Sequence, residues 1–331
     1  MAQAPVVVCC AVSTTSVDEI DGALLRGWCT LWLGAEPEKV LFQKGHLSAV
    51  VGLRLRNGAQ VVVKVRPSEG RIAGCVAVQR HLSERGFPCP RPLAGPAPLG
   101  NDVATAEALE AEGGYHERPG EAHGQLASLL AELVRLAPSP AQVPSLEPAP
   151  PWVGWAHGGR GLWPAPDDLD LDLNEHPGPA WIDDMAARLR QRLARDAAAP
   201  VVGHVDWESH NIRWLDGAPH VVDDWDSVAA LPEPAIAGAA AAVYPASANG
   251  RVVAATIAET EAFLRAYQRA RGPWGPGDEQ VCWTAGLWVM TYNAKKEIVG
   301  RRTGRKTLGG WTGYAEHCKR EARNRLGRAG L

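Results

Sequence analysis

The densest group of side chains capable of chemistry lies in residues 203–227, which read GHVDWESHNIRWLDGAPHVVDDWDS. Carboxylates this close together repel one another unless a positive group lies among them. A cation bound within the segment is therefore the first expectation. The residues concerned are His204, Asp206, His210, Asn211, Asp223, Asp224 and Asp226.

The dipeptide Asp216-Gly217 predicts a hairpin whose open end carries candidate metal ligands. Asp-Gly between two β-prone runs is a strong signal for a two-residue turn. Counting outward from this turn, Asn211 faces Val222, and Asp224 follows just beyond the second strand. Amide and carboxylate oxygens are hard ligands that suit Mg²⁺, so the pair predicts a magnesium site. Asp206 lies five residues before Asn211 and is expected to face the substrate of the same ion.

Each of these residues also has an ordinary structural interpretation. Acidic residues near an Asp-Gly turn are common on protein surfaces. His204 has the character of a packed, hydrogen-bonded loop histidine, and His210 and Asp223 are expected to face solvent. Asp226 either supports the metal site or stabilises the turn at Trp225. Neither set of interpretations is excluded by the segment alone.

A second hairpin, at Asn57-Gly58, contains a lysine among apolar residues. With a two-residue turn, Val51 faces Lys64. A lysine on an apolar face is unfavourable unless an anion meets it, although its ammonium group can also extend past the sheet edge into water. The nearby turn Lys44–Ser48, which contains Gly45, can aim backbone N–H groups at an anion. A phosphate would suit both features. The apolar residues expected beside Lys64 are Val51, Leu53, Leu55 and Val62.

The chain of 331 residues exceeds the usual size of one core, so two domains or lobes are expected. Short β-prone runs fill residues 40–66 and 102–109, and we place the boundary at a flexible joint, 110–114. This divides the chain into a strand-rich part, 1–109, and a mainly helical part, 110–331. Residues 138–179 are rich in Pro, Gly and Trp and predict an ordered but irregular insertion. Helices are expected over about 17–33, 71–88, 121–136, 181–196, 234–244, 251–271, 277–300 and 311–327.

Composition excludes several classes of protein. The net charge of −3 gives no reason to expect nucleic acid as a partner. Seven cysteines without CxxC spacing are typical of reduced thiols in a cytoplasmic protein. No apolar run approaches the roughly 20 residues that span a bilayer, and the first residues lack the basic segment of a signal peptide. We therefore expect a cytoplasmic protein, monomeric or homodimeric, without a membrane or nucleic-acid partner.

The ordered combination of a phosphate-type turn, an inward lysine, HxDxxxxN and DWD resembles the aminoglycoside phosphotransferase and choline kinase-like family, relatives of protein kinases. The resemblance runs from about Val40 to about Ala246, and the helices beyond it match only in character. It implies a two-lobed α+β kinase-like fold with a small N-terminal antiparallel-sheet lobe and a larger, mainly helical C-terminal lobe. The family's motif residues correspond to His204, Asp206 and Asn211 in the catalytic loop, Asp224 in the metal-binding motif, Lys64 as the nucleotide-binding lysine, and Gly45 and Ser48 in the phosphate loop.

The resemblance also implies a reaction, the direct transfer of the γ-phosphoryl group of ATP to a hydroxyl group of a small molecule. Asp206 would orient the hydroxyl and accept its proton, while Asn211 and Asp224 would hold Mg²⁺. Lys64 would hold the α- and β-phosphates. ATP would lie in the cleft near residues 104–109, with Glu107 and Leu109 beside it.

One feature departs from the family's pattern. A helix glutamate pairs with the lysine in that family, but the inward stripe of the 71–86 helix offers only Cys75 and Gln79. Glu69, on the preceding loop, is an alternative partner. The departure leaves open a nucleotide-binding pseudokinase without transfer activity. A metal-dependent hydrolase is a further alternative, with ligands His204, Asp206 and His210.

The acceptor is not identified by any motif. The acidic run at residues 167–184 lies where this family commonly builds its acceptor wall, and it contains seven acidic residues but no Lys or Arg. Its aspartates, including Asp170 and Asp172, alternate with leucines. If that row faced the cleft, it would favour a cationic acceptor such as an aminoglycoside or a basic peptide antibiotic. The alternative is a solvated acidic turn before the helix at 181–196.

Overall fold

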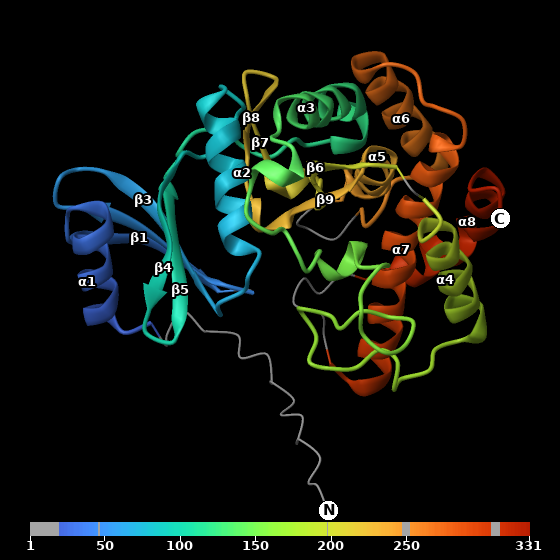
Figure 1. Cartoon of the computed structure of the whole chain (residues 1–331), viewed down its shortest axis with the longest axis horizontal. Helices are drawn as coiled ribbons and strands as arrows, with labels where there is room; N and C mark the ends of the chain where they lie inside the picture. Colours follow the sequence, from blue (N-terminus) through green and yellow to red (C-terminus); the bar gives the residue numbers. More distant parts are fainter. Residues whose placement is uncertain (1–19, 46, 197, 247–251, 306–311) are drawn as a thin grey trace, which may run out of the picture.

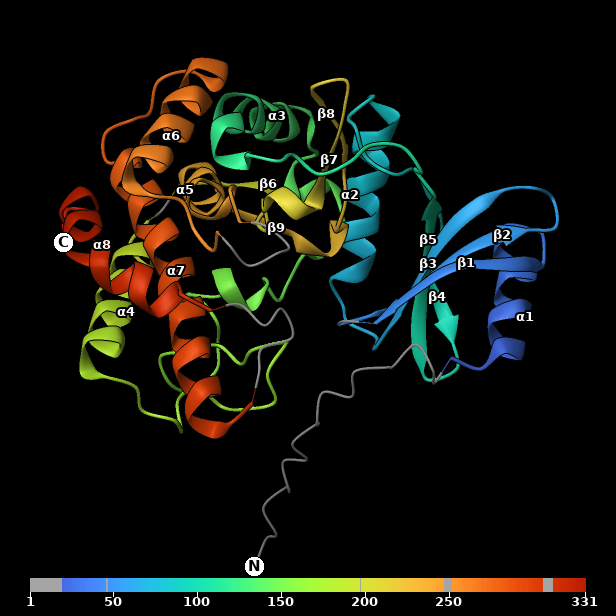
Figure 2. The ribbon, with the colours of Figure 1, turned by 180° about the vertical axis from the view of Figure 1, so that it is seen from behind.

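The computed structural model describes residues 20–331 except 46, 197, 247–251 and 306–311. It has two lobes, a sheet covered by one helix and a larger, mainly helical lobe (Figure 1). The helix α2 (Ile72–Glu84) lies between the two lobes, as the view from behind also shows (Figure 2). The predicted two-lobed α+β arrangement is confirmed.

The small lobe is built on an antiparallel sheet in the order β1-β2-β3-β5-β4. Helix α1 (Gly22–Leu33) packs on the sheet face that points away from the helical lobe (Figure 1). Its Trp28 and Cys29 are buried against alternate residues of the central strands. Asp21 caps the helix, because its side chain accepts a hydrogen bond from the backbone N–H of Ala23. The strands are β1 (Pro37–Gly45), β2 (Ala49–Leu55), β3 (Gln60–Arg66), β4 (Pro92–Leu99) and β5 (Asp102–Ala108).

The predicted register of the β2–β3 hairpin is wrong by one residue. Lys64 pairs with Val50 rather than with Val51. The turn holds three residues instead of two, because the N–H of Leu55 donates to Ala59 and Gly58 adopts φ of 87°. A shift of one residue moves a side chain to the other face of a sheet. Lys64 therefore lies on the face opposite α1, together with Val62, and this face lines the cleft.

The larger lobe is organised around α7 (Asp278–Thr303), which packs against α5 (Glu233–Val243) and is buried over most of its length. The apolar side of α2 joins this same core, through Val78 and Leu82. All six helices predicted for this part are present. The remaining four are α3 (His123–Leu136), α4 (Ala180–Leu193), α6 (Ile257–Arg271) and α8 (Tyr314–Arg328).

The insertion between α3 and α4 is irregular and ordered, as predicted. Its Trp155 and Trp163 are buried in the main core. Arg190 of α4 anchors the segment, because its guanidinium donates hydrogen bonds to the backbone oxygens of Trp155, His157 and Leu162. The insertion therefore forms a fixed wall of the larger lobe.

Two small antiparallel pairs complete the larger lobe. β7 (Ile212–Leu215) pairs with β8 (Ala218–Val222), across the predicted turn at Asp216-Gly217. A bulge after Arg213 places Ile212 opposite Val222, so the predicted pairing of Asn211 with Val222 is wrong by one residue. The second pair was not predicted: β6 (Pro200–His204) pairs with β9 (Val228–Pro232).

No helix among the described residues is long and apolar enough to cross a membrane.

Candidate functional site

The β6–β9 pair brings together the loops that carry Asp206 and Asp224. His204, the last residue of β6, lies opposite Val228, the first residue of β9. Asp206 follows the first strand and Asp224 precedes the second, so this pairing places the two carboxylates in one cavity. Tertiary pairing between strands 24 residues apart therefore builds the centre of the site.

His204 holds these two loops together. Its Nε2 lies 3.2 Å from the carbonyl oxygen of Asp223 and 3.0 Å from that of Asp224. Its Nδ1 accepts a hydrogen bond from the backbone N–H of Asp206 at 3.3 Å. Burial lowers the pKa of His204, so the ring is neutral at physiological pH. With both ring nitrogens engaged, His204 is a packed, hydrogen-bonded histidine at the end of β6 and does not fit the hydrolase's set of metal ligands.

Asp206 and Asn211 are joined directly. The Nδ2 of Asn211 donates to the Oδ2 of Asp206 at 2.8 Å and to its carbonyl oxygen at 3.0 Å. Burial and the neighbouring Asp224 carboxylate raise the pKa of Asp206 to about 6. The side chain is therefore ionised above that pH and can accept a proton.

Asp224 occupies a left-handed backbone conformation, with φ of 62°. Such a conformation is uncommon outside glycine and clusters at functional sites. Its Oδ2 accepts a hydrogen bond from the hydroxyl of Ser227 at 2.9 Å. Burial by itself raises the pKa of Asp224, but Lys64, the Ser227 hydrogen bond and Arg66 outweigh burial and hold this pKa below its ordinary value. The Asp224 carboxylate is therefore charged at physiological pH.

The neighbouring aspartates pair with arginines. Asp223, expected to face solvent, lies 2.9 Å from Nε of Arg213, which also donates to the carbonyl oxygens at 110 and 112. Asp226 forms an ion pair with Arg66 of β3, and its carbonyl oxygen accepts from Arg71. These contacts tie the loop of Asp224 to the small lobe and to the connection between the lobes.

The lysine's charge partner is neither Gln79 nor Glu69, the two residues considered from the sequence. Lys64 Nζ lies 3.1 Å from Oε1 of Glu107, on the neighbouring strand β5. Gln79 of α2 instead donates to Oε2 of Glu107 at 2.9 Å. Cys75, the other inward residue of the helix, contacts the carbonyl oxygen of Asp226.

The other residues predicted to contact nucleotide occupy different positions around the cleft. Ser48 lines the cavity beside Lys44, whereas Gly45 is exposed at the end of β1 and pairs with Ala49. Glu107 and Leu109 both line the cavity. The backbone N–H of Leu109 already donates to the carbonyl oxygen at position 60, at 3.0 Å, so its contribution to a ligand is its side chain.

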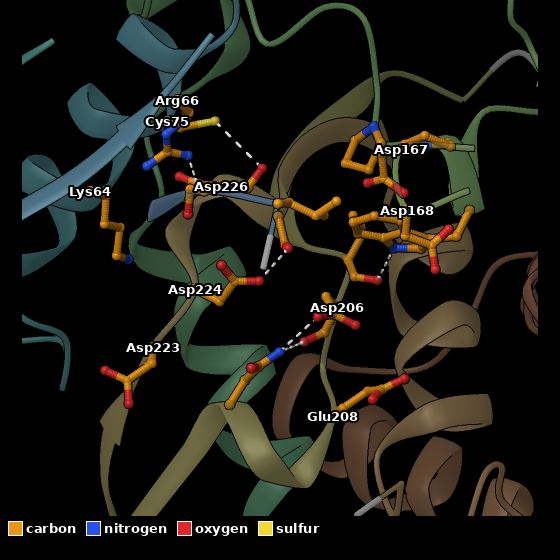
Figure 3. Close-up of a pocket in the computed structure, with 18 of the residues that line it drawn as sticks. Lys64, Arg66, Cys75, Asp167, Asp168, Asp206, Glu208, Asp223, Asp224 and Asp226 are labelled. Carbon is orange, nitrogen blue, oxygen red and sulfur yellow. Dashed lines mark hydrogen bonds and ion pairs between the residues drawn. The ribbon is translucent and has the colours of Figure 1, made fainter. Parts of the chain in front are cut away.

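One cavity of about 1110 Å³ is large enough for a nucleotide and a second small molecule, and its lining includes Ser48, Lys64, Glu107, Leu109, Asp206, Asn211 and Asp224. In Figure 3, Asp224 lies between Lys64 on one side and Asp206 on the other. The wall beyond Asp206 contains Asp167 and Asp168, the first two residues of the acidic run expected near the acceptor. Sequence reasoning missed its other two members, Glu208 and Lys296, because no motif marks them.

This wall is rich in carboxylates. Lys296 Nζ is held by both carboxylate oxygens of Asp168, each at 2.9 Å. Burial is the main cause of the raised pKa values of Asp167 and Glu208, and neighbouring carboxylates raise them further. His210 Nδ1 lies 3.2 Å from Glu208. Burial lowers the pKa of His210, so this histidine is neutral at physiological pH and does not compensate the charge of the carboxylates.

The predicted row of carboxylates at Asp170 and Asp172 lies elsewhere. Asp170 is exposed and pairs with Arg305 at 3.4 Å, and Asp172 accepts hydrogen bonds from Asn174. The leucines of this run, Leu169 and Leu173, are buried as the alternation implied. The acidic groups that this run contributes to the cavity are its first two residues, Asp167 and Asp168.

The donor set fits a hard cation in one place. Asn211, whose Nδ2 is committed to Asp206, keeps its Oδ1 as an acceptor, and the charged carboxylate of Asp224 lines the same cavity. Few protein oxygens suit Mg²⁺, which retains waters and substrate phosphates as further ligands. Among the described residues, no three His, Cys, Asp or Glu side chains are grouped to hold a metal ion by themselves.

Comparison with known families decides the class of this protein. Residues 27–280, more than half of the chain, match the profile of the phosphotransferase enzyme family. The chain belongs to the phosphotransferase enzyme family. The predicted membership of the aminoglycoside phosphotransferase and choline kinase-like group is thereby confirmed, and with it the class of small-molecule phosphotransferases. No curated protein matches the sequence closely enough to count as a relative.

Solved structures of this family share the fold. Amicoumacin kinase, in complex with AMP-PNP, Ca²⁺ and Ami, has a TM-score of 0.59 at 13% identity, over 93% of this chain and 94% of that one. A thermostable mutant of aminoglycoside phosphotransferase APH(4)-Ia has a TM-score of 0.56 at 14% identity, over 90% and 98%. Ethanolamine kinase from Plasmodium vivax has a TM-score of 0.53 at 10% identity, over 88% and 82%.

At these identities the likeness shows the fold alone, and that fold is kinase-like. The chain is an ATP-dependent phosphotransferase that acts on a small molecule. The structural neighbours act on different acceptors, so they leave the acceptor of this phosphotransferase undetermined.

Proposed function

We propose that this phosphotransferase transfers the γ-phosphoryl group of ATP, with Mg²⁺, to a hydroxyl group of a small molecule that also carries ammonium groups. One observation carries the choice of a cationic acceptor. Asp167, Asp206 and Glu208 line one side of the cavity, and burial together with neighbouring carboxylates raises the pKa of each of them, while the nearby Lys296 is engaged by Asp168.

On the nucleotide side, Lys64 would contact the α- and β-phosphates, and Ser48 with the turn after Gly45 would cover them. Two further residues of the cleft, Glu107 and Leu109, would border the nucleotide. Lys64 suits this role because its side chain is only 13% exposed and lies on the face of the sheet that lines the cleft. A buried ammonium group at the cavity attracts a polyanion more strongly than an exposed one.

Asn211 and Asp224 would hold Mg²⁺, which when bound would neutralise charge on the β- and γ-phosphates. The residues of the chain prepare this site themselves. The Ser227 hydroxyl fixes one oxygen of Asp224, and the Asp206 carboxylate fixes the amide of Asn211. Both ligands are therefore held before any cation arrives.

Asp206 would orient the acceptor hydroxyl and accept its proton as the bond to phosphorus forms. Its carboxylate is held by Asn211 and is ionised above a pH of about 6. A positioned base of this kind contributes typically 10²–10⁴-fold to a rate. The proton leaves the hydroxyl, the new phosphoester bond forms, and ADP departs.

The ammonium groups of the acceptor would meet Asp167 and Glu208. Carboxylates this close together repel one another in the free protein. A cation bound beside them compensates this repulsion, which adds to the affinity for the cation. Aminoglycosides, which carry several ammonium groups beside hydroxyls, are the first acceptors to test. Neutral polyols would leave the repulsion between these carboxylates uncompensated and are expected to react poorly.

The test is a panel of matched hydroxylated molecules, with and without amines, incubated with ATP and Mg²⁺ and examined by mass spectrometry for added phosphate. We expect cationic acceptors to react best and kcat/KM to fall as salt is raised. Asp167→Asn and Glu208→Gln should lower kcat/KM for cationic acceptors at least tenfold.

Asp170→Asn is the matched control, because this carboxylate lies on the same segment but is exposed and pairs with Arg305. Its kcat/KM should remain close to that of the wild type. Preferential phosphorylation of neutral acceptors, unaffected by Asp167→Asn and Glu208→Gln, would refute the cationic acceptor. Absence of phosphate transfer to every acceptor, neutral or cationic, would count against the assigned chemistry as a whole.

A further inference from the structure

The nucleotide-side lysine has its charge partner within its own sheet. Lys64 on β3 and Glu107 on β5 lie 3.1 Å apart, with side chains 13% and 11% exposed. Val62 pairs with Glu107 and Lys64 with Thr105, so the two charged residues are diagonal neighbours on the cleft face. Their separation is set by the hydrogen-bonded ladder of β3 and β5.

A second contact fixes the carboxylate. Gln79 Nε2 donates to Oε2 of Glu107 at 2.9 Å and to the carbonyl oxygen of Pro90 at 2.8 Å. One carboxylate oxygen thus faces the helix α2 and the other faces Lys64. Because Gln79 is uncharged, it orients Glu107 without competing with Lys64 for its charge.

Other carboxylates are poorly placed for this role. Glu69, the loop residue considered from the sequence, is exposed. Asp224 interacts electrostatically with Lys64, but this carboxylate is expected to serve the cation. Lys64 therefore interacts with two carboxylates, those of Glu107 and Asp224. Its ammonium group has three N–H donors, which leaves donors for a phosphate after it contacts Glu107.

We propose that Glu107 is the positioning residue for Lys64 and that it replaces the helix glutamate implied by the family resemblance. The inference rests on the proposed function, since it assumes that Lys64 meets the phosphates of ATP. Both partners belong to one sheet, so the charge partner of Lys64 does not come from α2, which contributes only the uncharged Gln79. Glu107 acts through Lys64, and the nucleoside part of ATP does not require it.

The test measures binding of ATP and of adenosine, each with Mg²⁺, by calorimetry on the full chain. Glu107→Gln keeps the shape and the hydrogen bond to Gln79 but removes the charge. We expect about tenfold weaker binding of ATP and unchanged binding of adenosine. Glu107→Asp, which keeps the charge, should retain more ATP affinity than Glu107→Gln. Thermal melting checks that each variant is folded.

Two comparisons separate positioning from a merely structural effect. Glu69→Gln, the matched control, removes the same charge from the cleft margin and should leave ATP affinity unchanged. In a Lys64→Met background, Glu107→Gln should cause no further loss of ATP affinity, because the residue through which it acts is gone.

The outcomes distinguish this inference from the function beneath it. Wild-type protein that binds no ATP would refute the proposed function and, with it, this role of Glu107. Wild-type protein that binds ATP, with Glu107→Gln binding it equally well, would overturn the positioning role alone. Equal loss of ATP and adenosine binding, or additive losses with Lys64→Met, would also overturn it.

Discussion

The side-chain amide of Asn211 donates a hydrogen bond to the carboxylate of Asp206 at 2.8 Å. This bond joins the proposed catalytic base to a proposed metal ligand. It also determines which end of the Asn211 amide remains for a cation, because the Nδ2 end is occupied and Oδ1 is the acceptor. Replacing Asp206 is therefore expected to remove the proton acceptor, whereas replacing Asn211 is expected to remove an oxygen ligand of the cation.

Replacing Asp206 with Asn should abolish phosphate transfer while leaving nucleotide binding nearly intact. The variant keeps the size of the side chain but removes the group that accepts the proton. We expect turnover to fall about 10²–10⁴-fold, the usual contribution of a positioned base. Product formation followed by mass spectrometry, alongside ATP binding by calorimetry, checks this. Near-normal turnover of Asp206→Asn would show that another group accepts the proton.

Replacing Asp224 with Ala should remove the Mg²⁺ dependence of ATP binding, whereas Asp223→Ala should preserve it. The carboxylate of Asp224 lines the cavity and its pKa is held below the ordinary value, while Asp223 is paired with Arg213. The loss of Asp223 should instead appear as lower stability, since Arg213 also holds the connection between the lobes. ATP titrations with and without Mg²⁺ measure the first effect and thermal melting the second. Equal effects of both variants on Mg²⁺-dependent binding would contradict the assignment of Asp224.

Replacing Gly238 with Ala should destabilise the larger lobe. A Cβ atom at this position of α5 would lie 2.0 Å from the backbone oxygen of Cys282 on α7, so the two helices must separate. Overpacking of this kind costs about 1–3 kcal/mol or more. Gly27→Ala is the matched control, because Gly27 occupies an exposed position of α1 with nothing within 4 Å of the new Cβ. It should raise stability by about 0.5–1 kcal/mol in denaturant unfolding. Equal stability of the two variants would mean that α5 and α7 are not packed this closely.

Replacing Glu233 with Gln should destabilise the larger lobe, and the size of this effect should depend on pH. Burial raises the pKa of Glu233, but hydrogen bonds from Arg271 and Tyr267 outweigh it and hold the pKa below its ordinary value of 4.5. A lowered pKa in the folded state stabilises the fold above the ordinary value and loses that contribution as pH falls below it. Glu233→Gln should therefore cost about 1–3 kcal/mol at pH 7 and progressively less below pH 4.5. Unfolding by denaturant at several pH values measures this, and a difference independent of pH would contradict it.

Local sequence signals were sufficient for the helices of both lobes and for the two hairpin turns. Apolar periodicity marks a helix wherever one face is buried, and Asn-Gly or Asp-Gly marks a tight turn through its backbone preference. The ordered motifs around Lys64, Asp206 and Asp224 were sufficient to recognise the family. The strand β4 was not predicted, because prolines at positions 92, 96 and 98 argue against a strand. An edge strand such as β4 tolerates them.

The register of the strands was not specified by these local signals. A third residue in the turn before Ala59 moved Lys64 to the other face of the sheet, and a bulge after Arg213 shifted the second hairpin. Whether a turn holds two residues or three depends on how its strands pack, which the dipeptide alone does not specify. Neither error displaced the candidate residues from the cleft, because Lys64, Asn211 and Asp224 all line it.

The sequence by itself therefore determined the class of enzyme and predicted its candidate residues, because these lie in short motifs whose spacing is a local property of the chain. Only the tertiary structure decided which charges meet. Glu107 reaches Lys64 across two neighbouring strands, and Asp167 reaches the wall of Asp206 from an irregular insertion. Contacts between residues far apart in the chain depend on how whole helices and strands pack. A short window of sequence does not determine that packing.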